Sequence, residues 1–266
     1  MPPRTSLDLA NLVRKLGDAS QTEAHQKIEA LCRNRDDPGI HAAVVAAGAI
    51  PLLLQLLEPG SATLARKSAA ATLTYLARTP EIAVAITTAG AIPRLVQLLE
   101  PGSEVQRGAA GVLSNLALNS QNRATIAAAG AIPRLVQMLG SGSPDAVQCR
   151  AAVALMSLAM LAENAVTIAA AGATPLLVQL LSGPPNQAQR AAGALRTLTG
   201  GPENTDNKVT IAAAGAIPLL MLLLAPGLPA LAQDDAVGAL WNLATVLIRG
   251  FGETKFGKFT KWRAQR

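Results

Sequence analysis

The chain has 266 residues, enough for one large domain or two small ones, and half are apolar although only six are aromatic. Two cysteines exclude a disulfide-stapled fold, and the start Met1-Pro-Pro-Arg has no apolar segment, so we expect a reducing compartment and no secretory signal. The net charge is +6, but residues 249–266 carry +5 of it. Because the remainder is nearly neutral, the basic pI indicates no nucleic-acid-binding fold.

The first expected elements are helices at 7–16 and 22–33. Both carry charged side chains at many positions, unlike the segments that follow: Arg14, Lys15, Glu23, Lys27 and Glu29. We interpret residues 1–35 as the polar N-terminal end of an array, a partial capping repeat.

A repeated pentapeptide dominates the rest of the chain. Ala-Gly-Ala-Ile-Pro begins at residues 47, 89, 129 and 214, and Ala-Gly-Ala-Thr-Pro begins at 171. The glycines are 42, 40, 42 and 43 residues apart. A fixed period of this length indicates a repeat protein in which each unit is one supersecondary motif.

The second copy shows what one unit predicts in chain order. A short helix at 81–88 ends at Gly90, which can adopt the positive φ that closes a helix, and Pro93 suits the first turn of the next helix. A second helix at 94–100, a Pro-Gly-Ser loop and a longer third helix at 104–118 follow. Each three-helix unit has an apolar face that only a neighbouring unit can bury.

The last repeat contains an uncharged stretch, residues 209–232, that is long enough to span a bilayer. It holds several prolines, so we expect a buried helix pair there instead of a membrane span. The final helix, 231–247, still presents apolar side chains, and Trp241 is expected to pack at the end of the stack. We expect either that Phe251 and the tail cover the apolar side of this last helix, or that the natural protein is longer.

These segments resemble armadillo repeats. Residues 122–139 (NRATIAAAGAIPRLVQML) are similar to the first two helices of that repeat, and residues 105–117 (VQRGAAGVLSNLA) are similar to its third helix. The resemblance extends from about residue 6 to 244. It implies an all-α fold, a right-handed alpha-alpha superhelical solenoid of about six repeats, with the third helices lining a concave groove. The expected repeats are 36–78, 79–118, 119–160, 161–200 and 201–248, followed by a flexible basic and aromatic tail, 249–266.

The resemblance also indicates where a ligand would bind. Armadillo proteins that bind nuclear localisation signals carry an asparagine ladder and a tryptophan ladder on the third helices. The asparagine ladder aligns here with Arg33, Tyr75, Asn115, Ser157, Thr197 and Asn242, so asparagine occurs twice in six positions. The tryptophan positions, among them Gly193 and Gly238, hold no tryptophan. This departure argues against nuclear-import-type cargo binding.

Charged residues lie one helical turn before these ladders. Lys67 and Arg107, with Arg33, make the first repeats basic, whereas Asp234 and Asp235 make the far end acidic. We therefore expect a protein or peptide ligand whose acidic part lies on the N-terminal repeats. The predicted ligand-groove residues are Arg33, Lys67, Tyr75, Arg107, Asn115, Ser157, Thr197, Asp234 and Asn242.

The sequence shows no catalytic motif. His25 and His41 have no cysteine or carboxylate at metal-ligand spacing, and Cys149 has no histidine partner, so we expect no enzyme activity, metal, cofactor or small-molecule substrate. The leading hypothesis is an interaction scaffold in the cytoplasm, with the nucleus left open as a further location. The alternatives are the substrate-recognition part of a ubiquitin-ligase assembly and a membrane-associated adaptor that contacts lipid only through its tail.

Overall fold

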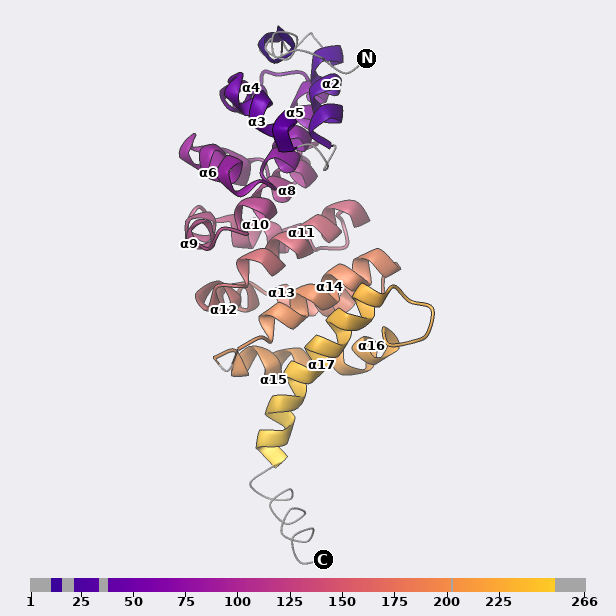
Figure 1. Ribbon diagram of the computed structural model, residues 1–266. Coiled ribbons are helices and arrows are strands. Elements are labelled where there is room, and N and C mark those ends of the chain that lie inside the picture. The colour runs from indigo at the N-terminus through magenta and orange to yellow at the C-terminus, as the bar shows by residue number, and fades with distance from the viewer. Residues whose placement is uncertain (1–10, 16–21, 34–37, 202, 252–266) are drawn as a thin grey trace, which may run out of the picture. The chain divides into compact units, whose positions relative to one another are not determined.

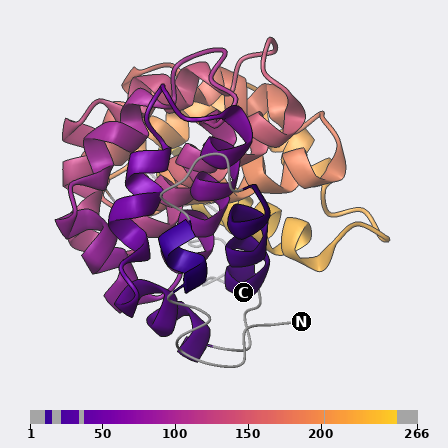
Figure 2. The ribbon, with the colours of Figure 1, turned by 90° about the horizontal axis from the view of Figure 1, so that it is seen from above.

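The computed structural model describes residues 11–15, 22–33, 38–201 and 203–251, and its described part is helical without a strand (Figures 1 and 2). The chain divides into two compact units, residues 1–138 (unit 1) and 139–266 (unit 2). Each unit is described by itself.

Unit 1 contains nine labelled helices that follow the three-helix pattern expected from the repeats. Residues 11–15 are also helical, inside the expected helix 7–16. The helices are α2 (Thr22–Arg33), α3 (Pro38–Ala46), α4 (Ala49–Leu56), α5 (Thr63–Leu76), α6 (Pro80–Thr88), α7 (Ala91–Gln97), α8 (Gln106–Leu116), α9 (Ser120–Ala128) and α10 (Ala131–Gln137).

Unit 2 continues the same order of short, short and long helices. The helices are α11 (Asp145–Leu158), α12 (Ala162–Ala170), α13 (Ala173–Leu180), α14 (Pro185–Leu198), α15 (Thr205–Ala213), α16 (Ala216–Leu222) and α17 (Ala230–Phe251). We call α2, α5 and α8 the third helices of unit 1, and α11, α14 and α17 the third helices of unit 2.

The corner between the first and second helix of each repeat is made by glycine. Gly90 and Gly130 have φ of 73° and 84°, and Gly172 and Gly215 have 84° and 82°, all in the left-handed region. The positive φ predicted for these glycines is confirmed. The second helix begins directly after the glycine, so α7 starts at Ala91, three residues earlier than predicted, and Pro93 lies in its first turn.

Glutamine side chains hold the loop between the second and third helices. Nε2 of Gln106 donates to the Leu99 carbonyl oxygen at 2.8 Å, and Nε2 of Gln233 donates to that of Ala225 at 2.9 Å. Gln148 does the same to Leu139, at 3.0 Å. Each bond joins the start of a third helix to a carbonyl two or three residues past the end of the second helix.

The third helices form the core of each unit. In unit 1, α5 packs against α2 and α8, and in unit 2, α14 packs against α11 and α17 (Figure 1). The approach of α5 and α8 is close, since a Cβ added at Gly108 would lie 2.6 Å from the Ala70 Cβ. Leu73 and Leu113 are fully or almost fully buried there. Alanine and glycine at the contacts therefore bring the third helices together while leucine fills the space between them.

The apolar stretch 209–232 is divided among helices. It runs through the end of α15, all of α16 and the start of α17. In the described part of the chain no single helix is long and apolar enough to cross a membrane. One pair of helices, Gly39–Ala46 and Ala49–Leu56, is long and apolar enough when the two are taken together, but the pair is bent by 78° at the break between them.

The last helix is longer than predicted, since α17 runs to Phe251, past the expected boundary at 248. Its Leu243 is buried, but Val237 is 53% exposed and Trp241 is 74% exposed. Trp241 is therefore not packed within unit 2, contrary to expectation. Residues 252–266 lie outside the described part of the chain, and so does the predicted capping by the tail.

Replacing Gly172 with alanine should destabilise the fold. The Gly172→Ala variant must hold a Cβ at φ +84°, which costs about 1–2 kcal/mol. Gly142 is a matched control because its φ is not positive and an added Cβ meets nothing within 4 Å. Urea denaturation should give a lower midpoint for Gly172→Ala and an unchanged or higher one for Gly142→Ala. Equal midpoints would show that the corner does not require glycine.

Candidate peptide-binding surface

Two basic side chains stand on the third helices of unit 1, as the sequence predicts. Lys67 on α5 and Arg107 on α8 are both exposed. Lys67 Nζ lies 3.2 Å from Oε2 of Glu104, and about half of each of these side chains is exposed. Glu104 therefore offsets part of the Lys67 charge, which sequence reasoning missed.

The two asparagines of the expected ladder bind the preceding third helix. Nδ2 of Asn115 donates to the Thr74 carbonyl oxygen at 2.7 Å, in the last turn of α5. Nδ2 of Asn242 donates to the Arg196 carbonyl oxygen at 3.1 Å, in the last turn of α14. Nδ2 of Asn242 also donates to Oγ1 of Thr199 at 3.3 Å, so both amides join neighbouring repeats. Both residues are half-buried, so part of each amide remains at the surface.

The hydroxyl positions of the ladder are turned into their own helices. Ser157 is buried, and its Oγ donates to the Val153 carbonyl oxygen at 3.2 Å. Thr197 is half-buried, and its Oγ1 donates to the Gly193 carbonyl oxygen at 3.0 Å. Because each hydroxyl is bonded one turn back along its helix, these two positions offer less to a ligand than the alignment suggests.

The remaining predicted ligand-groove residues differ in their exposure to solvent. Tyr75 is half-buried on α5, and Asp234 is exposed at the start of α17. Arg33 is the last residue of α2, and its side chain lies outside the described part of the molecule. The structure therefore brings Lys67 and Tyr75 onto α5, beside Arg107 and Asn115 on α8, and keeps the other described positions in unit 2.

The acidic end expected in unit 2 is partly neutralised. Nη1 of Arg196 lies 3.2 Å from Oδ1 of Asp235, whose side chain is 16% exposed. A Cβ added at Gly238 would lie 2.5 Å from Nε and 2.6 Å from Cδ of Arg196. The glycine at this tryptophan-ladder position therefore makes room for Arg196, and a side chain of the protein itself lies where a ligand would otherwise contact the helix.

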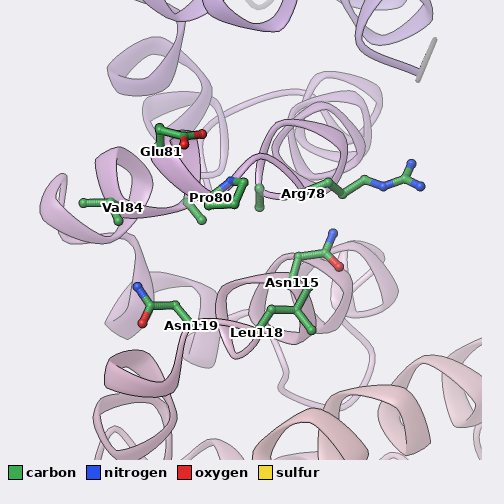
Figure 3. Close-up of a pocket in the computed structure, with 9 residues that line it drawn as sticks. Arg78, Pro80, Glu81, Val84, Asn115, Leu118 and Asn119 are labelled. Atoms are coloured by element: carbon green, nitrogen blue, oxygen red, sulfur yellow. The ribbon is translucent and has the colours of Figure 1, made fainter. Parts of the chain in front are cut away.

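A pocket of about 400 Å³ opens in unit 1 at the ends of two third helices (Figure 3). Residues after the end of α5 and at the start of α6 form one side, and residues at the end of α8 form the other. Leu118 is 59% exposed and Val84 is 50% exposed, so the pocket presents apolar side chains to solvent. Residues that line it include Arg78, Pro80, Glu81, Val84, Asn115 and Leu118.

This pocket lies just past the end of the predicted row. Arg78 comes two residues after α5 ends at Leu76, and Leu118 comes two residues after α8 ends at Leu116. The signal was present in the sequence, since extending the ladder from Asn115 to Leu118 identifies the pocket wall. The prediction did not include Leu118, because the armadillo resemblance defines no ligand-contacting position beyond the asparagine ladder.

A second set of asparagines, also missed, fastens the first helix of a repeat to the preceding third helix. Nδ2 of Asn122 donates to the Leu116 carbonyl oxygen at 2.9 Å, and Nδ2 of Asn164 donates to that of Leu158 at 3.1 Å. Asn207 makes the same bond to Leu198 at 3.3 Å. All three asparagines are buried, and their spacing of 42 and 43 residues was visible in the sequence.

Removing one of these amides should destabilise the fold. Asn164→Ala removes one of the two donors to the Leu158 carbonyl, which keeps its bond from the Leu161 N–H, so we expect a loss of about 0.5–1.5 kcal/mol in the free energy of unfolding. Gln179→Ala, at an exposed position on α13, is the control and should be neutral. Thermal and urea unfolding measure both, and an undiminished stability of Asn164→Ala would contradict this role.

The two cysteines are free and differ in exposure. Burial raises the pKa of the Cys32 thiol to about 12. Burial also raises the pKa of Cys149, which is half-buried, while the nearby Arg190 opposes that rise. In the described residues no group of three or more His, Cys, Asp or Glu side chains could hold a metal ion.

Thiol labelling at pH 8 should distinguish the two cysteines. We expect Ellman's reagent to modify Cys149 slowly and Cys32 only after unfolding in guanidinium chloride, because the folded protein favours the protonated thiol at Cys32. Cys149→Ser should then show no reactive thiol in the native state. The raised pKa of Cys32 also means that its contribution to stability is lost as the pH rises from about 9 towards 12. Rapid labelling of native Cys149→Ser would contradict the burial of Cys32.

Comparisons with known proteins agree with this architecture. The profile of the Armadillo/beta-catenin-like repeat matches residues 79–118, 119–159 and 204–245. The comparison with curated proteins gave no match. An engineered protein of known structure is 32% identical, with a TM-score of 0.79 over 90% of this chain and 97% of that one. A second engineered protein is 30% identical, with a TM-score of 0.80 over 90% and 99%.

A third solved structure carries a ligand in its description. It is a designed armadillo repeat protein in complex with the peptide (KR)4, 26% identical, with a TM-score of 0.75 over 88% of this chain and 99% of that one. The chain belongs to the armadillo/beta-catenin-like repeat family. The predicted fold class, an all-α solenoid of armadillo repeats, is confirmed.

Proposed function

We propose that the protein is a non-catalytic scaffold that binds an extended or helical segment of a partner protein along its third helices. The observation that carries this proposal is the row on α5 and α8, where Lys67, Arg107, Tyr75 and Asn115 are exposed or half-buried on two helices that pack together. Such a row offers charge, an aromatic ring and an amide about two helical turns apart on each helix, which suits a ligand that crosses several helices.

Two designed relatives support a peptide as the ligand. One is described in complex with (KR)4, and another, also 26% identical with a TM-score of 0.74, is described as designed for modular peptide recognition. In this chain, the charges on the third helices of unit 1 indicate the sign of the ligand. Lys67 and Arg107 are exposed in unit 1, and Glu104 pairs with only one of them. We therefore propose that an acidic segment binds unit 1.

The side chains of unit 2 indicate that its third helices contribute less to ligand binding than those of unit 1. Arg196 covers Gly238 and pairs with Asp235, while Ser157 is buried. The Gly193 position is similarly occupied, since an added Cβ would lie 3.1 Å from both Asp235 Oδ2 and Met156 Sδ. Glycines in place of stacking indoles argue against import-type recognition of lysine side chains.

Two free thiols suit a reducing compartment, and we propose that the scaffold acts in the cytoplasm or nucleus.

Charge reversal on the third helices tests the proposal. Lys67→Glu combined with Arg107→Glu should weaken binding of a fluorescein-labelled (Asp-Glu)4 peptide about tenfold at low ionic strength, because like charges then face the ligand. Fluorescence anisotropy measures the affinity. The same assay with a (Lys-Arg)4 peptide should show weaker binding to the unmodified protein.

A matched control separates a local effect from the net charge. Gln55, Gln97, Gln137 and Gln179 occupy the same exposed position on the second helices, and replacing all four with glutamate changes the net charge by the same amount as the double reversal. This variant should keep the affinity for the acidic peptide. Equal affinities for the two variants, or no binding of the acidic peptide to the unmodified protein, would dispose of the proposal.

A further inference from the structure

The pocket of unit 1 lies at one end of the proposed binding row. Arg78 and Leu118 come two residues after the ends of α5 and α8, and three residues after Tyr75 and Asn115, so a segment that follows the row to the ends of these helices reaches the pocket. Asn115 belongs to both, because it is a ladder residue and lines the pocket.

The walls of the pocket favour an apolar occupant. Leu118 is 59% exposed and Val84 is 50% exposed. Burying large apolar side chains away from water is favourable, so an apolar ligand group that covers them would be stabilised. Ala77 and Ala83 line the pocket and are almost fully buried, so the floor is made of small apolar side chains. A volume of about 400 Å³ is within the range of sites that enclose small apolar groups and is ample for one aromatic ring or one leucine.

The charges at the rim favour carboxylates on one side of that occupant. Arg78 and Glu81 both line the pocket, and Figure 3 shows the Arg78 side chain extending away from Glu81. Within the described residues neither makes an ion pair with another side chain. Arg78 lies at the rim just past the end of α5, the helix that carries Lys67, so that side of the pocket is basic.

We propose that this pocket binds one large apolar side chain, aromatic or leucine, of a partner segment that carries carboxylates next to it on the Arg78 side. The inference rests on the proposed function, because the acidic part of the same segment would lie on Lys67 and Arg107. It adds the anchor that the ladder does not supply, since a single buried apolar or aromatic side chain commonly dominates the affinity of a peptide interface. The partner is thus an acidic segment with an apolar anchor.

Two labelled peptides test the anchor, (Asp-Glu)4 alone and (Asp-Glu)4 followed by phenylalanine and glycine. We expect the phenylalanine to raise the affinity of the full chain about tenfold, measured by anisotropy. Val84→Trp fills the pocket from an exposed position and should abolish this gain without changing the affinity for (Asp-Glu)4. Leu118→Ser, which removes an apolar wall, should act in the same direction.

Unit 2 supplies matched controls at the same positions of its repeats. Val166 corresponds to Val84 and is 57% exposed, and Met160 corresponds to Leu118 and is 58% exposed. Val166→Trp and Met160→Ser should leave the gain from phenylalanine intact. Thermal unfolding of all four variants confirms that each is folded before its affinity is compared.

The outcomes separate the two proposals. If neither peptide binds, the proposed function fails and the anchor fails with it. If both peptides bind equally, or if Val166→Trp abolishes the gain as fully as Val84→Trp does, only the pocket proposal is overturned. Self-association of the unmodified protein that Val84→Trp abolishes, with equal binding of both peptides, would identify a second copy as the occupant and overturn the proposal as well.

Discussion

The structure depends on hydrogen-bond donors for the carbonyl groups at the ends of its many short helices. A helix of seven to fourteen residues, such as α7 or α11, leaves its last carbonyl groups without donors, and these are a large share of its backbone when the helix is short. Backbone N–H groups of the following turn supply some of these donors, and amide side chains add others. Gln106 bonds a carbonyl just past the second helix of its repeat, Asn122 bonds the end of the third helix before it, and Asn115 reaches the third helix of the previous repeat. Packing of alanine and leucine then brings the elements close enough for these bonds to form.

The chain's own need for donors also limits what its surface can give to a ligand. An asparagine that donates to Thr74, as Asn115 does, has one fewer donor for a peptide backbone. An arginine lying over Gly238 is held by Asp235 and covers the helix. Unit 1 retains an exposed Arg107 near the start of α8 and an open pocket past the end of α8, and for this reason the proposals concern unit 1.

The repeat could be predicted from the sequence because its signals are local. A glycine before a proline-containing helix requires the same backbone at residues 48, 90, 130, 172 and 215, whatever surrounds it. The position of a ladder residue along its helix is also local, so Lys67 and Asn115 were placed correctly on third helices. What a side chain touches depends on a helix about forty residues away. The Lys67–Glu104 pair, the Arg196–Asp235 pair and the burial of Ser157 could not be obtained from one repeat at a time. The longer α17 was missed because its sequence past residue 248 has no counterpart in the other repeats.

The buried amides of Asn122, Asn164 and Asn207 have a consequence for how such a chain can grow. Each joins a helix to the one immediately before it, over six to nine residues of sequence. A duplicated segment of one period would therefore arrive with both its donor and its acceptor, and the new junction would repeat an existing one. Lengthening by whole modules requires no newly evolved interface, and the nine-residue link from Leu198 to Asn207, against six in the other two pairs, shows that the bond tolerates a longer connecting loop.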